Sequence, residues 1–109
     1  MDFREYQQKA RETAIYPGVG NNLWYPALGL AGEAGEVAEI IKKVYRDQSG
    51  TLDTYATSKL LKELGDVLWY VAALCSEAGL NMGYVVEENC RKLQSRKERG
   101  VLHGNGSNR

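Results

Sequence analysis

Apolar residues recur at helical spacing along most of the chain, in stretches separated by breaks that contain Gly, Pro and Asn. An Asp2–Glu5 capping box favours a helix start near the N-terminus. Pro26 suits the opening of a second helix, and Asn81 suits the cap of the last one. The predicted helices cover residues 3–14, 26–46, 55–78 and 82–98. We therefore expect an all-α fold, a four-helix bundle.

The third predicted helix is apolar around nearly its whole circumference, because Leu61, Leu68 and Trp69 lie outside its main stripe. A four-helix chain of 109 residues can hardly surround such a helix. We therefore expect oligomerisation to complete the bundle, as a homo-oligomer that is a dimer or a tetramer. Gly35 and Gly65 support this, since a glycine inside a helix usually marks the close approach of another body.

Two carboxylate pairs repeat 30 positions apart in one frame, Leu-x-x-Glu-x-Gly-(Glu/Asp)-Val. The first pair is Glu33 and Glu36, and the second is Glu63 and Asp66. Residues three apart share one side of a helix, so each pair can direct its oxygens into one small volume at the margin of the apolar stripe. Only Lys59 is placed to neutralise them locally. Either the acids are protonated or a cation is bound, because an unpaired buried charge is costly.

Oxygen ligands without His or Cys favour a hard cation, which predicts Mg²⁺ with Mn²⁺ as a substitute. The Glu-x-x-His motif of carboxylate-bridged iron sites is absent. On the fourth helix, Asn89, Lys92 and Arg96 form one row beside an apolar stripe, and such a row can bind an anion. The alternative is a solvated face with snorkelling side chains. Magnesium together with this row suggests a polyphosphate substrate, although no Walker-type loop is present.

The charge balance, 14 basic and 14 acidic residues, gives no reason to expect nucleic acid or an anionic membrane as a partner. No apolar run approaches the roughly 18 residues of a membrane span. The two cysteines lie in helical patterns and no secretory segment precedes them, which favours the cytoplasm. One domain over residues 1–99 and a flexible Gly- and Asn-rich tail over residues 100–109 are expected.

Over residues 3–98 the chain resembles small MazG-like nucleoside triphosphate pyrophosphohydrolases of the all-α NTP pyrophosphatase superfamily. That superfamily carries Glu-Glu-x-x-Glu followed by Glu-x-x-Asp. This sequence offers Gly32-Glu33-Ala34-Gly35-Glu36 and Glu63-Leu64-Gly65-Asp66, so Gly32 replaces the first acid. The resemblance implies that Glu33, Glu36, Glu63 and Asp66 bind magnesium and that Asn89, Lys92 and Arg96 contact the phosphates.

The implied reaction is hydrolysis between the α- and β-phosphates, which gives a nucleoside monophosphate and pyrophosphate. Glu33 or Glu63 is expected to take the proton of the attacking water. Proteins of this type occur among phages that edit the nucleotide pool, which favours a deoxypurine such as dGTP and, for a phage protein, the host cytoplasm. Two alternatives stay open: a phosphoribosyl-ATP pyrophosphatase-like enzyme and a non-enzymatic helical oligomerisation module.

We also expect an apolar slot that binds the base of the nucleotide. Aromatic side chains on the connection between the first two helices can stack on a ligand, or else cover the core. The residues of the expected slot are Ile15, Trp24, Tyr25 and Trp69.

Overall fold

The computed structural model describes all 109 residues and contains four helices and no strand. The helices are α1 (Phe3–Glu12), α2 (Trp24–Asp47), α3 (Thr54–Glu77) and α4 (Met82–Glu98). The all-α prediction is confirmed, and α4 has the predicted bounds. Helix α2 begins two residues earlier than predicted, because the Asn22 side chain accepts hydrogen bonds from the N–H groups of Trp24 and Tyr25.

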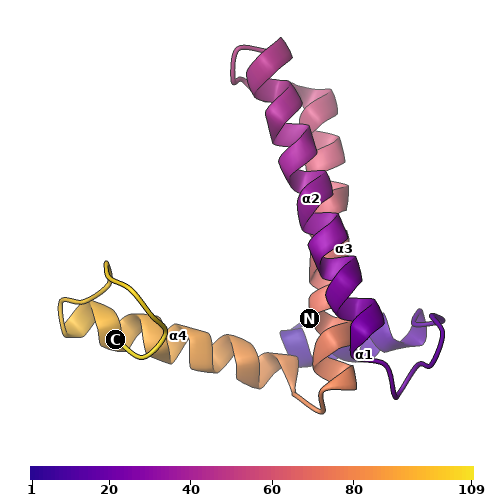
Figure 1. Cartoon of the computed structure of the whole chain (residues 1–109), viewed down its shortest axis with the longest axis vertical. Coiled ribbons are helices and arrows are strands. Elements are labelled where there is room, and N and C mark those ends of the chain that lie inside the picture. The colour runs from indigo at the N-terminus through magenta and orange to yellow at the C-terminus, as the bar shows by residue number, and fades with distance from the viewer.

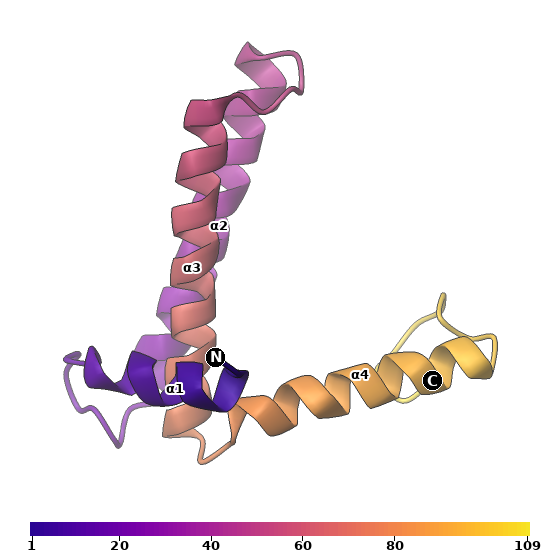
Figure 2. The ribbon, with the colours of Figure 1, turned by 180° about the vertical axis from the view of Figure 1, so that it is seen from behind.

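Helices α2 and α3 form a long hairpin, and α1 lies across the base of α3 (Figures 1 and 2). The Asp2–Glu5 capping box is present at the start of α1. A small apolar cluster holds the base together, with residues from α1, α3 and the first turn of α4. Its buried members are Ala10, Ala72, Cys75 and Met82.

Helix α4 packs on α1 at its first turn and then projects away from the hairpin (Figure 1). The Gln7 side chain fixes this junction. Its amide nitrogen donates to Ser76 Oγ (3.1 Å) and to the Leu80 carbonyl (2.8 Å), and its amide oxygen accepts from the Met82 N–H (2.8 Å). A single chain thus leaves an open angle between α4 and the hairpin. The whole chain measures 44 × 42 × 27 Å.

Much apolar surface stays exposed in the single chain, where only 11 of 109 residues are buried. Leu61 on α3 is 70% exposed, and Leu64 and Leu68 on the same helix are also exposed. A Cβ placed at Gly35 or Gly65 would meet nothing within 4 Å, so the close approach expected there is not made inside the chain. Completion of the bundle by other copies stays a prediction.

The tail after α4 turns back along the helix. Arg109 donates to the carbonyls of Val101 and Leu102, and Arg96 donates to the Ser107 carbonyl. No helix of the chain is both long enough and apolar enough to cross a membrane.

Candidate functional site

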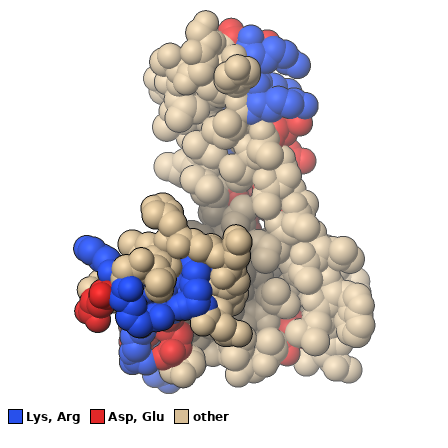
Figure 3. Space-filling model, turned by 60° about the vertical axis from the view of Figure 1, so that its left-hand side comes forward, with Lys and Arg blue, Asp and Glu red and all other residues tan.

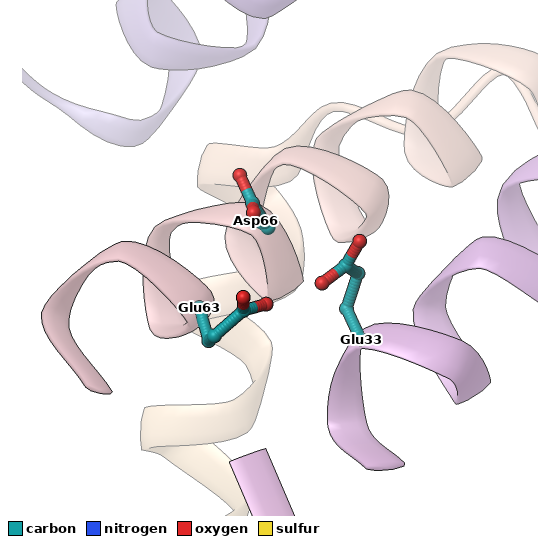
Figure 4. A group of neighbouring side chains, drawn as sticks. All are labelled: Glu33, Glu63 and Asp66. Carbon is teal, nitrogen blue, oxygen red and sulfur yellow. The ribbon is translucent and has the colours of Figure 1, made fainter. Parts of the chain in front are cut away.

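Three carboxylates converge where α2 faces α3. Glu33 comes from α2, while Glu63 and Asp66 lie one turn apart on α3 (Figure 4). One oxygen from each lies within 4.8 Å of the others. Glu36 is exposed and lies outside this group. The structure therefore brings together three of the four acids expected from the sequence.

No basic side chain compensates this cluster. None of its carboxylates forms an ion pair with Lys or Arg. Lys59, the expected neutraliser, lies over the Tyr55 ring, with Nζ 5.4 Å from the ring centroid. Oxygen Oε2 of Glu63 is buried and has no hydrogen-bond partner. The cluster thus carries negative charge that nothing in the protein offsets.

The shortage of positive charge changes the acidity of Glu33. A hydrogen bond with Glu63, partial burial and repulsion from the neighbouring carboxylates raise the pKa of Glu33 to about 7. The buried Glu63 oxygen also has no hydrogen-bond partner, because three ionised carboxylates offer no donor to one another. A proton on Glu33 supplies one donor, and a bound cation removes the need for it.

The donor set fits a hard divalent cation. All of its ligand atoms are carboxylate oxygens, which Mg²⁺ and Mn²⁺ prefer, and the exposed side at Asp66 leaves room for water and phosphate. The buried, unpartnered oxygen of Glu63 is an acceptor without a donor, as expected of a ligand atom.

A cavity of about 350 Å³ adjoins the cluster. Its walls are Thr13, Glu33, Asp66, Trp69 and Tyr70. The indole Nε1 of Trp69 donates to Thr13 Oγ1 (2.8 Å), and the Trp69 and Tyr70 rings meet edge to face with centroids 5.0 Å apart. The cavity therefore offers aromatic surface beside the carboxylates.

Tyr70 is held by close packing against α2. A Cβ added at Gly29 would lie 2.2 Å from the Tyr70 ring, so only glycine fits beneath this ring. Gly29 is thus a helical glycine at which another helix of the same chain approaches closely. Tyr70 and Thr13 were not among the predicted binding residues. The position of Tyr70, four residues after Asp66 on the same helix face, was the signal that could have found it.

Two predicted binding residues lie outside this cavity. Ile15 is 91% exposed and Trp24 is 72% exposed, and neither lines the cavity. Of the expected slot, Trp69 lines the cavity, and Tyr25 stacks on Tyr16 with ring centroids 5.0 Å apart.

The predicted cationic row lies on α4. Asn89 and Lys92 line a groove of about 430 Å³ along that helix, together with Leu80 and Tyr84 among others. Arg96 is only 5% exposed, and desolvation, followed by repulsion from Arg109 and Arg99, lowers its pKa. Basic side chains, with some acidic ones among them, gather on the part of the surface that comes forward in Figure 3, and Figure 1 shows α4 projecting from the hairpin. Within one chain, the row is not joined to the carboxylates.

Comparisons with known proteins give one relative and one matching family model. The chain is 47% identical to the Gene 37 protein of Mycobacterium phage L5 over 109 residues, which is 95% of this chain and 96% of the phage protein. No solved structure matches the chain. The model of the MazG nucleotide pyrophosphohydrolase domain matches residues 26–101, which contain all three clustered carboxylates. The chain therefore belongs to the MazG nucleotide pyrophosphohydrolase family.

Proposed function

We propose that the protein is a Mg²⁺-dependent nucleoside triphosphate pyrophosphohydrolase that converts a (d)NTP to the (d)NMP and pyrophosphate. The observation that carries the proposal is the convergence of three uncompensated carboxylates beside an aromatic cavity, in a chain of this family. An oligomerisation module has no need for such a cluster at the edge of its core.

Glu33, Glu63 and Asp66 hold the metal in this proposal, with Glu36 as a further ligand on the exposed side. When bound, Mg²⁺ offsets the negative charge of the phosphates and acidifies water. Glu33 or Glu63 is the proposed general base, because a carboxylate oxygen beside the attacking water can accept its proton. That oxygen takes the proton as water attacks the α-phosphorus. The bond from that phosphorus to the bridging oxygen then breaks, and pyrophosphate leaves.

The base of the nucleotide is proposed to lie against Trp69 and Tyr70. Both rings line the cavity beside Asp66, and aromatic faces stack well on purines. A deoxypurine such as dGTP is the favoured substrate, in a role in nucleotide-pool control. Trp24 and Ile15 remain predicted contacts that lie outside the cavity of the single chain.

The phosphate contacts are proposed to come from α4 of a neighbouring copy in a dimer or tetramer. The cluster lacks cations, whereas Lys92 on the α4 groove forms no ion pair. The adjacent Arg91 is already paired with Glu87 and Glu88. The exposed leucines of α3 offer the apolar surface for such an assembly.

Turnover tests the proposal. The purified protein is incubated with Mg²⁺ or Mn²⁺ and each of the eight common NTPs and dNTPs, and separately with phosphoribosyl-ATP, and the products are resolved by chromatography. We expect one NMP and pyrophosphate from at least one substrate, and loss of this reaction in Asp66→Asn. Cleavage of phosphoribosyl-ATP alone would favour the other enzyme class, and no turnover with Mg²⁺ or Mn²⁺ would favour the oligomerisation module.

A further inference from the structure

The most strongly bonded carboxylate of the chain lies outside the acidic cluster, at the end of α3. The side chain of Glu77 is 0% exposed and accepts four hydrogen bonds. Two come from side chains and two from backbone N–H groups of the connection between α1 and α2, residues 13–23, which we name the strap. The donors are Arg11 Nη2 (2.9 Å), the Tyr16 hydroxyl (2.5 Å), Gly20 N (2.8 Å) and Asn22 N (2.8 Å).

The backbone of the strap directs two N–H groups at the buried carboxylate of Glu77. Gly20 has a φ of +94°, which lets the backbone direct its N–H toward Glu77, and the Asn22 N–H joins it two residues later. These hydrogen bonds, led by that of Tyr16, lower the pKa of Glu77 to about 2. The carboxylate is therefore ionised near neutral pH, and the strap is folded around a negative charge.

The strap in turn contacts the cavity. The ring of Tyr16 meets the indole of Trp69 edge to face, with centroids 6.3 Å apart, and stacks on Tyr25. Thr13, at the start of the strap, accepts the hydrogen bond from Trp69 Nε1 (2.8 Å). Trp69 lines the cavity that contains Glu33 and Asp66. Two contacts thus connect the strap to one wall of the candidate site.

We propose that Glu77 is a positioning residue for substrate binding, which holds the strap on α3 so that Tyr16 and Thr13 fix the indole of Trp69. This inference rests on the proposed function for its kinetic consequence. Glu77 lines neither the cavity nor the acidic cluster. Its loss therefore loosens the wall that the base contacts and leaves the metal ligands in place, so that KM changes more than kcat.

The test compares Glu77→Gln, which removes the charge and keeps the size, with Asp53→Ala. Asp53 is a matched control because its carboxylate also accepts a hydrogen bond from a backbone N–H, that of Ala56 (2.8 Å). It lies at the start of α3, whereas Glu77 lies at the end. Steady-state kinetics give kcat and KM. In a Trp24→Phe background, acrylamide quenching reports on Trp69, the other tryptophan of the chain.

For Glu77→Gln we expect KM to rise about tenfold with kcat within about twofold of the wild type. Quenching of Trp69 should increase, while Mg²⁺ affinity stays unchanged. Asp53→Ala should lower Tm but leave KM and quenching alone. Equal KM and quenching in the two variants would overturn the proposal and leave Glu77 as a structural anchor.

Two further variants keep the test decisive. Should Glu77→Gln not fold, Tyr16→Phe removes the shortest of the four hydrogen bonds and retains the ring, and increased Trp69 quenching is again expected. Thr13→Val removes the acceptor for Trp69, and its effect on KM should be non-additive with that of Glu77→Gln. If the wild type cleaves no nucleotide, the proposed function fails, whereas quenching still decides the role of Glu77.

Discussion

At the scale of single residues, the two carboxylates of this chain with the largest pKa shifts move in opposite directions for opposite reasons. Glu33 lies among like charges without a donor, and its pKa rises to about 7. Glu77 lies among donors, and its pKa falls to about 2. An acid held by donors stabilises the fold, whereas an acid crowded by other acids weakens it in the absence of metal.

The free energy of unfolding of the metal-free protein should decrease as Glu33 loses its proton between about pH 4.5 and 8. Its pKa in the folded state lies above the ordinary value of 4.5, so folding binds a proton in this window. The stabilisation is complete below pH 4.5 and is lost as the pH rises through 7. Thermal unfolding in EDTA across this range measures it, and Glu33→Gln should flatten the profile. A parallel decline in Glu33→Gln would contradict the assignment.

Removal of charge at Glu63 should separate metal binding from folding. Glu63→Gln removes a carboxylate whose buried Oε2 has no partner, so the metal-free variant should have a Tm equal to or above that of the wild type. The increase in Tm that Mg²⁺ gives the wild type should disappear in the variant. Calorimetry with and without Mg²⁺ checks both results, and a retained Mg²⁺ effect would remove Glu63 from the ligand set.

The acid repeat could be predicted from the sequence because i, i+3 spacing gives the helix face directly. The choice among the four acids could not. Residues three apart lie on one side of a helix but about 4.5 Å apart along its axis, so the packing of the partner helix decides which of Glu33 and Glu36 meets Glu63. The exposure of Ile15 and Trp24 was equally hidden. Ile15 lies in the strap, which is held by hydrogen bonds to Glu77, a residue more than 50 positions away in the sequence.

At the scale of elements, the packing of α2 on α3 depends on Gly29. The Tyr70 ring occupies the place of its missing side chain, so Gly29→Ala must displace the ring or separate the helices. We expect a loss of about 1–3 kcal/mol in the free energy of unfolding, as for other overpacked cores. Urea unfolding measures this loss.

Gly32→Ala on the same helix is the control, because its Cβ would meet nothing in the chain. It should stabilise the protein by about 0.5–1 kcal/mol through helix propensity. Similar losses in both variants would show that the Tyr70 contact is not the cause.

At the scale of the whole molecule, the exposed face of α3 predicts self-association. Light scattering at micromolar concentration should give a dimer or tetramer. Leu61→Glu should shift the protein to monomer with little change in monomer fold, because this side chain is 70% exposed in the single chain. Leu102→Glu in the tail is the control for an added charge. A monomeric wild type would refute the prediction.

Sharing of sites between copies can be tested by co-expression. Asp66→Asn damages the acidic cluster, and Lys92→Ala damages the α4 row. If each site combines the cluster of one copy with α4 of another, mixed oligomers contain intact sites and should recover about a quarter of the wild-type activity at low substrate concentration. No recovery above the two separate variants would place both groups in one chain.

Helix α4 is anchored at its first turn, where the Gln7 side chain forms three hydrogen bonds, and the rest of the helix projects from the hairpin. A helix of 17 residues is about 25 Å long, so a tilt of about 5° at its base moves the far end by about 2 Å. A displacement of that size breaks a hydrogen bond. The position of the far end of α4 therefore depends on the packing of its first turn, which includes the buried Met82 and the three hydrogen bonds of Gln7. If α4 reaches the acidic cluster of a neighbouring copy, as proposed, a substitution of Gln7 would change that contact from the other end of the helix.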